Sequence, residues 1–131
     1  MMDTSALVAA LIEDHEHHAL SRPHLKTGIR LPAIVLAETF AQLRRTFGQS
    51  AATATAVVGP FAAGSEAVLP TSASAVAAVV SRAVELDLGG NIHDALIAQV
   101  CAEHDLPLVT LDGRQHRLAL ALGARSTYLL A

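Results

Sequence analysis

Four acidic residues stand where their side chains could act together, although long stretches of sequence separate them. Asp3 and Asp112 each directly follow a segment predicted to be a strand, and Asp94 and Glu38 lie on predicted helices. In a parallel sheet, ligands bind beyond the carboxyl ends of the strands. Asp3 and Asp112 are therefore expected at such ends. A turn or cap role would explain either one alone better, but the two together indicate more than that.

The sequence leaves two interpretations of Asp94 open. On a helix, Asp94 lies in line with Ala98 and Cys101, so an ionisable group stands at the start of an apolar helix face. Burying its charge costs free energy unless the carboxylate has a partner. That partner is either the set of first-turn amides of the helix or a cation shared with other carboxylates. Glu38 lies opposite an apolar stripe and beside Gln42 and Arg45, which by itself predicts a solvated helix face.

Segments of helical and strand character alternate along the chain. Helices are predicted over 4–12, 13–26, 36–47, 49–63, 72–88, 93–104 and 115–122, and strands over 30–35, 66–69, 107–111 and 125–130. Thr4 or Ser5 is the expected cap of the first helix, and the Gly59–Pro60 pair is expected to break or kink the fourth. Met1 and Met2 would supply a very short fifth strand. This alternation predicts an α/β fold with a mostly parallel sheet covered on both faces.

Composition limits the classes of protein that need to be considered. A chain of 131 residues and 13.6 kDa, 52% hydrophobic and 16% charged, is expected to fold as one domain. Three Phe, one Tyr and no Trp argue against a nucleic-acid surface built on stacked aromatic rings, and a net charge of −3 argues against a simple basic-patch DNA binder.

Cysteine count and hydropathy predict the compartment. Cys101 is the single cysteine, so there is no internal disulfide and no zinc cluster of cysteines, and its simplest role is in the core. No apolar run approaches the roughly 18 residues of a membrane span, and no basic region precedes the first apolar segment. A soluble cytoplasmic protein is expected.

Four short motifs in order resemble those of PIN-domain ribonucleases, and in particular of the VapC toxins of type II toxin–antitoxin pairs. They are Asp3-Thr4-Ser5-Ala6-Leu7, Leu36-Ala37-Glu38 followed by Leu43-Arg44-Arg45, Gly89-Gly90-Asn91-Ile92-His93-Asp94-Ala95-Leu96-Ile97-Ala98, and Leu108-Val109-Thr110-Leu111-Asp112. The resemblance covers the whole chain. Each motif is common by chance, but four in this order on an α/β pattern are strong evidence.

The resemblance implies a three-layer α/β/α PIN-like domain over 1–131, with a mostly parallel sheet of about five strands. It also implies one acidic pocket that holds Mg²⁺ or Mn²⁺ and hydrolyses RNA phosphodiester bonds. In this assignment Asp3 and Asp94 are the best direct metal ligands. Asp112 is a further ligand, and Glu38 binds a metal-held water or helps to activate the nucleophile. Hydroxyls at the Ser5 and Thr110 positions would support the pocket.

Two departures from the family pattern stand next to these motifs. Many relatives have a further Asp or Asn shortly after the fourth acid, where this chain has Gly113 and Arg114, and this difference could weaken a second metal site. His93 replaces the aromatic residue that often precedes the third acid. A packing role for its ring is favoured over contact with the scissile phosphate.

The resemblance also implies partners: an RNA substrate, a cognate VapB-type antitoxin, and either a homodimer or a toxin–antitoxin hetero-oligomer. The Ala/Val faces of 51–63 and 73–84 are candidate contact surfaces, although packing inside the monomer would explain them equally well. A catalytically silent PIN-fold binding or scaffold module is the alternative function.

Two further groups of residues have side chains that could bind a ligand. His15, His17 and His18 could in principle bind zinc or nickel, but a water-facing polar helix is favoured. Several arginines could border the cleft and guide phosphates, although ordinary solubility explains any one of them; they are Arg44, Arg45, Arg82, Arg114 and Arg117.

Overall fold

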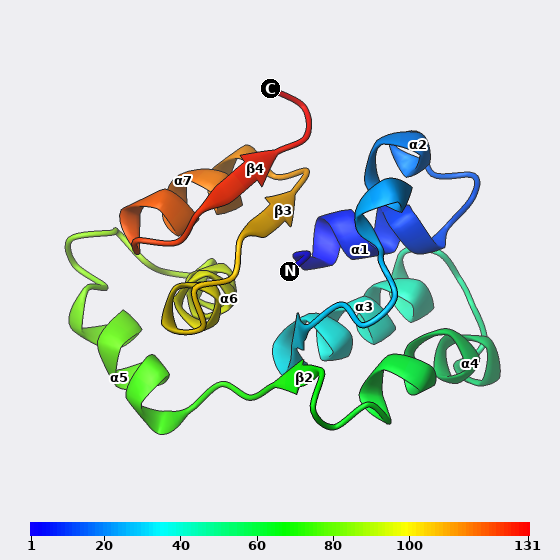
Figure 1. Ribbon diagram of the computed structural model, residues 1–131, viewed down its shortest axis with the longest axis horizontal. Coiled ribbons are helices and arrows are strands. Elements are labelled where there is room, and N and C mark those ends of the chain that lie inside the picture. The colour runs from blue at the N-terminus through cyan, green and yellow to red at the C-terminus, as the bar shows by residue number, and fades with distance from the viewer.

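Short parallel strands lie between two groups of helices in the computed structural model, which describes residues 1–131 (Figure 1). Strand β1 (Leu31–Pro32) pairs with β2 (Val68–Leu69), and β3 (Leu108–Thr110) pairs with β4 (Ser126–Tyr128), both in parallel. Met2 adds an isolated parallel bridge to β3. The predicted α/β fold with parallel strands is confirmed. Its strands form two pairs and one bridge, instead of one continuous sheet of about five strands.

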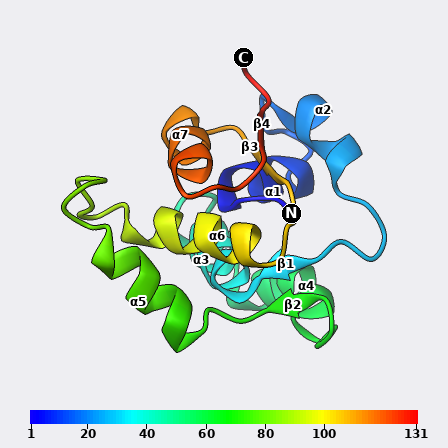
Figure 2. The same ribbon diagram turned by 60° about the vertical axis from the view of Figure 1, so that its left-hand side comes forward.

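Seven α-helices and one 3-10 helix surround these strands. They are α1 (Thr4–Leu11), α2 (His18–Ser21), η1 (Arg22–His24), α3 (Ala33–Arg45), α4 (Ala51–Ala62), α5 (Ala73–Ser81), α6 (Ile92–Glu103) and α7 (Gly113–Ala121). In Figure 1, α1 to α4 lie to the right of β3, and α5 to α7 lie to its left. In the turned view of Figure 2, α5 and α7 lie on the left and α2 and α4 on the right. The arrangement corresponds to the expected α/β/α layers. None of the helices has the length and hydrophobicity needed to cross a bilayer.

The core is aliphatic and centres on the start of the chain. Met2, Leu7, Ile97, Val100 and Leu108 are almost completely buried, and they bring the first residues, α1, α6 and β3 into one cluster. Burying a side chain of this size stabilises the fold by about 1.5–3 kcal/mol. The few residues before α1 are thus held firmly, although they form only a bridge and not a full strand.

The predicted strand 30–35 ends earlier than expected, and the following helix begins earlier. Pro32 is the cause of both differences. The strand stops at Pro32, which has no N–H for a sheet hydrogen bond. With φ −60° and ψ 138°, Pro32 is the residue from which α3 begins. The apolar residues Ile34 and Val35 belong to the helix, where Val35, Leu36 and Leu43 are buried.

Three other predicted features are wrong for local reasons. The cap of α1 is Asp3, not Thr4 or Ser5, because its carboxylate accepts a hydrogen bond from the Ala6 N–H at 2.9 Å. Helix α4 is not broken at Gly59–Pro60, which was one of the two expected outcomes, since Pro60 lies in the last turn and removes only one backbone donor. The polar segment 13–26 contains turns and only two short helices, α2 and η1.

Helix α5 is also shorter than predicted. It ends at Ser81, and turns occupy most of the following residues up to 88. Val84 is 97% exposed, so burial does not favour extending the helix through it. Asp87, with φ 50°, adopts the left-handed conformation and excludes a continuous α-helix at that point.

Candidate functional site

Asp3 reaches the carboxyl edge of the strands because the first residues of the chain pair with β3. The N–H of Val109 donates to the Met1 carbonyl at 2.8 Å, and the N–H of Asp3 donates to the Val109 carbonyl at 3.1 Å. Parallel neighbours end at the same edge, so the residue after Met2 lies beside the residues that end β3. Asp3 is only 4% exposed. Its place in the fold therefore depends on this pairing and on its role as the α1 cap.

Two hydroxyl groups connect Asp3 to the turn after β3. Ser5 donates to the carboxylate of Asp3 at 2.8 Å and accepts from the N–H of Leu111 at 3.1 Å. Thr110 donates to the other carboxylate oxygen and accepts from the N–H of Asp112 at 2.9 Å. Each hydroxyl thus uses its single proton on Asp3 and one lone pair on the turn. The two side chains hold Asp3 and the turn that carries Asp112 in one rigid unit.

Asp112 is positioned as the cap of α7. Its carboxylate accepts from the N–H of Arg114 at 2.8 Å, and its backbone is extended at φ −103° and ψ 115°. One oxygen satisfies the start of the helix, and the second carboxylate oxygen has no hydrogen-bond donor. Asp112 is half-buried, so the side chain is accessible from solvent.

Glu38 belongs to the same site, contrary to the solvated helix face that its position on α3 predicted. The Thr4 hydroxyl, on α1, donates to Glu38 Oε1 at 2.8 Å across 34 residues of sequence. Glu38 is half-buried and forms no ion pair with Arg45. Thr4 was expected only as a cap, and no sequence pattern shows which side chain faces the first turn of α1.

Asp94 lies in the first turn of α6, where the positive end of the helix dipole favours a carboxylate. The buried Gln115 on α7 donates through Nε2 to the main-chain carbonyl of Asp94 at 3.0 Å. This bond connects the start of α6 to the start of α7. Gln115 therefore helps to position Asp94 relative to Asp112, and sequence reasoning did not identify it.

Electrostatic coupling links all four carboxylates. Burial raises the pKa of Asp3 to about 6, against hydrogen bonds that favour its charged form, and the charge of Asp112 adds to the rise. Burial also raises the pKa of Asp94, and the charges of Glu38 and Asp112 raise it further. Asp112 thus lies within electrostatic range of both Asp3 and Asp94, and Glu38 lies within range of Asp94, so the four acids form one connected group.

The donor set fits a hard divalent cation. Every candidate ligand is a carboxylate oxygen, which is what Mg²⁺ and Mn²⁺ prefer, and like charges gathered in one place are stabilised by a cation. No three of these groups stand close enough to bind one ion together with their side chains alone. An ion shared among them would keep water molecules in its coordination sphere, as Mg²⁺ commonly does.

His93 and Cys101 are two other residues for which the sequence predicted a role. His93 is exposed, so the favoured packing role is wrong, and its ring borders a shallow hollow together with Glu38 and Arg45. Cys101 is fully buried, as a core residue should be, and burial raises the pKa of its thiol to about 12.

The histidines of the second predicted helix are not arranged as a metal site. His15 lies in a turn before α2, and its Nδ1 accepts from the N–H of His17 at 3.1 Å. His18 uses its Nδ1 on the carbonyl of Ala9 at 2.8 Å. No group of three potential ligands forms there.

The sequence of the chain is similar to that of a known protein family. A family described as "PIN domain" matches residues 1–120. A search among curated proteins finds no match.

Proposed function

The chain belongs to the PIN-domain family, and from this membership we propose that it is an Mg²⁺-dependent endoribonuclease, the VapC-type toxin of a type II toxin–antitoxin pair. PIN domains are generally nucleases and typically bind divalent metal ions. The observation that carries the proposal is the network of hydrogen bonds that joins the elements carrying the four carboxylates. Ser5 and Thr110 connect Asp3 to the turn of Asp112, and Gln115 connects the start of α7 to Asp94. Glu38 is joined to the first turn of α1 through Thr4.

Each carboxylate has a distinct role in this proposal. Asp3 and Asp94 would hold the ion, because hydroxyl donors orient the first and the start of α6 orients the second. Asp112 would reach the ion with its second oxygen through a water molecule, because no three of these side chains stand close enough to bind one ion directly. Bound there, the ion would supply Lewis-acid stabilisation of the charge that develops on the phosphate and would activate water for attack.

Glu38 is the candidate for moving the proton of the attacking water. It is half-buried, and only one of its oxygens accepts a hydrogen bond, from Thr4. The other oxygen has no donor and could accept a proton. Thr4 would then act as a positioning residue that fixes the direction of this carboxylate.

The proposal predicts cleavage that depends on a divalent ion. Purified chain is expected to cut single-stranded RNA internally with Mg²⁺ or Mn²⁺ and to leave it intact with EDTA. At an ion concentration about 100 times its Kd, binding should stabilise the fold by about 2.7 kcal/mol and raise Tm by on the order of 10 °C. Gel analysis of labelled RNA and thermal melts test both points.

Expression of the chain in a bacterial host tests the toxin assignment. Growth arrest with newly cleaved RNA ends would support it. Intact RNA, normal growth and an unchanged Tm with either ion would instead favour a silent PIN-fold binding or scaffold module.

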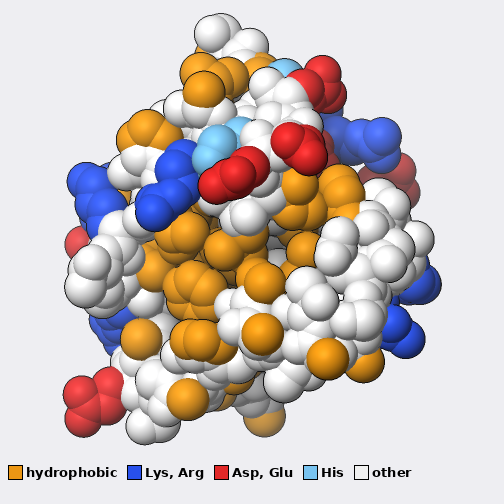
Figure 3. Space-filling view, turned by 90° about the vertical axis from the view of Figure 1, so that its right-hand side faces the viewer, with side chains coloured by type: hydrophobic (Ala, Val, Ile, Leu, Met, Phe, Trp, Pro, Cys, Tyr) orange, Lys and Arg blue, Asp and Glu red, His pale blue; other side chains and the backbone are white.

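A small antitoxin protein is the proposed binding partner of an apolar hollow on the side where α2 and α4 lie. Figure 3 shows hydrophobic side chains gathered in the centre of this side, with acidic, basic and histidine side chains near its upper edge. One hollow there is lined by Leu11, Ile12, Leu43, Gln49, Thr53 and Val57. The contribution of α4 is in line with the expected contact surface in 51–63.

The second expected surface, 73–84, supports a homodimer. Val76, Val80 and Val84 are 39%, 53% and 97% exposed, and the first two lie one helical turn apart on α5. The purified chain is expected to have twice the mass of 13.6 kDa by light scattering. Substituting Asp for both Val80 and Val84 should give the monomer mass while the chain remains folded, because neither side chain is in the core. A wild-type chain of monomer mass would contradict the dimer.

A further inference from the structure

A hollow lined by two arginines lies beside the carboxylates, between α7 and the segment that joins α5 to α6. Four of its residues occupy successive turns of one face of α7, at i, i+3, i+4 and i+7. The lining residues are Glu85, Leu86, Asn91, Arg114, Arg117, Leu118 and Ala121. The side chains of Arg114 and Arg117 therefore border the same concave surface.

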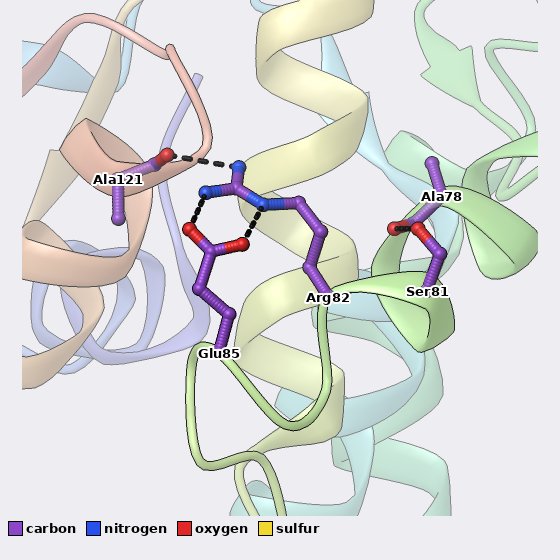
Figure 4. A network of polar contacts seen from close by, with 5 residues as sticks. All are labelled: Ala78, Ser81, Arg82, Glu85 and Ala121. Carbon is purple, nitrogen blue, oxygen red and sulfur yellow. Dashed lines mark hydrogen bonds and ion pairs between the residues drawn. The ribbon is translucent and has the colours of Figure 1, made fainter.

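The single acid in this hollow is already neutralised. Glu85 accepts from Arg82 at 2.7 Å and 3.1 Å, in a bidentate pair, and Arg82 also donates to the carbonyl of Ala121 at 3.0 Å (Figure 4). Arg114 and Arg117 have no side-chain hydrogen bond and no ion pair. The hollow therefore carries two guanidinium groups that form no ion pair with any acid of the chain.

Asn91 adds a neutral donor of defined orientation. Its Oδ1 accepts from the N–H of Gly89 at 2.8 Å, so the amide NH₂ group faces away from that bond and has no partner. The free polar groups of the hollow are thus donors: two guanidinium groups and one amide. Such a set binds an oxyanion, and arginine forks in particular match the oxygens of a phosphate.

The hollow adjoins the proposed catalytic residues. Arg114 is in the first turn of α7, and its N–H is bound by the Asp112 carboxylate at 2.8 Å. Asn91 is the residue from which α6 begins, three residues before Asp94. The charge of Arg114 also reaches Asp94, where it acts against the rise in that carboxyl's pKa.

We propose that Arg114, Arg117 and Asn91 bind a backbone phosphate of the substrate RNA, adjacent to the phosphate that is cleaved. This inference rests on the proposed nuclease function and adds a substrate-positioning subsite to it. The subsite holds the strand across the carboxylates without contacting the reacting atoms. It also explains how a chain with net charge −3 can attract a polyanion at one location.

The test compares two doubly substituted chains of equal charge. R114Q/R117Q removes the proposed contacts. R22Q/R125Q removes two exposed arginines outside the hollow: Arg22 donates to the carbonyl of Leu25, and Arg125 pairs with Asp105 at the amino edge of β3 and β4. Both variants are expected to keep the wild-type Tm, because all four side chains lie outside the core.

Binding of a fluorescent single-stranded RNA is measured by anisotropy in EDTA, from 50 to 200 mM salt. Each lost phosphate contact on a single strand reduces the slope of log K against log salt by about 0.7. Both arginines are proposed to bind one phosphate, so R114Q/R117Q should lose about 0.7. R22Q/R125Q should retain the wild-type slope. In cleavage assays with Mg²⁺, KM should rise about tenfold in R114Q/R117Q, with kcat nearly unchanged, because the contact is made equally in the ground state and the transition state.

The outcomes separate this inference from the nuclease proposal. Equal slopes and equal KM in wild type and R114Q/R117Q would overturn the subsite, even if the wild type cleaves RNA. A wild type that binds RNA with an arginine-dependent slope but never cleaves it would retain the subsite and overturn the nuclease. A wild type that neither binds nor cleaves RNA would overturn both.

Discussion

Substituting Asn for Asp94 is expected to reduce kcat/KM for RNA cleavage about a thousandfold or more. The carboxylate of Asp94 lies within electrostatic range of Glu38 and Asp112. A neutral amide at this position would weaken the binding of an ion held among these side chains. A loss of about 4 kcal/mol of transition-state stabilisation, which is in the range a metal ion supplies, corresponds to this factor. Single-turnover cleavage with saturating Mg²⁺ measures it.

The same variant should lose most of the increase in Tm that Mg²⁺ gives the wild type. Asp105→Asn is the matched control, since Asp105 is exposed, lies in the loop before β3 at the opposite edge of the strands, and has φ 49°, which Asn tolerates. It should retain both activity and the thermal shift. An Asp94→Asn protein with a wild-type thermal shift would refute the metal assignment of this residue.

Substituting Asn for Asp3 is expected to abolish cleavage and yet to stabilise the metal-free protein at neutral pH. Burial raises the pKa of Asp3 from the ordinary 3.8 to about 6 in the folded chain. Between these values the folded state binds more protons than the unfolded state, so stability falls as pH rises. The difference corresponds to about 3 kcal/mol, present as a cost above pH 6 and absent below pH 4.

Asn removes this cost because it carries no charge, while its Oδ1 can still accept from the Ala6 N–H and cap α1. Urea unfolding in EDTA from pH 4 to pH 8 should show Asp3→Asn more stable than the wild type by about 2 kcal/mol at pH 7. The two proteins should converge near pH 4. A variant that is less stable than the wild type across the whole range would show that the hydrogen bonds of Asp3 outweigh its desolvation.

These two predictions describe a site whose function opposes its stability. Asp3 and Asp94 are held near other acids by the fold, and the raised pKa of each reflects that cost. Hydroxyl groups of Ser5 and Thr110 offset part of it at Asp3. A free-energy cost from acids held close together is typical of a functional site, since a protein selected for stability alone would avoid such a cluster.

Most of the element order could be predicted, and the errors have local physical causes. Apolar periodicity identified α1, α3, α4, α6 and α7, and the run Pro107–Leu111 identified β3. Proline ended β1 early, and the exposure of Val84 left the residues after α5 without a buried face. Neither effect can be read from the pattern of apolar residues. The first depends on the missing backbone N–H of Pro32, and the second depends on which segments of the fold pack against Val84.

The amino-acid sequence by itself determined which side chains are the candidates for the proposed chemistry. Acids follow two strand ends and open one helix, and this placement depends only on local periodicity and on the chain order of the strands. The tertiary structure alone decided what each acid faces. A helical pattern gives the direction of Glu38 around α3 but not the neighbour across from it, which is the Thr4 hydroxyl 34 residues away.

The same physical reason applies to the arginines. Five stood as equal candidates in the sequence, but Arg82 is bound by Glu85 and Ala121, whereas Arg114 and Arg117 face an open hollow without partners. Whether a charge is compensated depends on contacts between residues distant along the chain, and only the packed fold establishes these contacts.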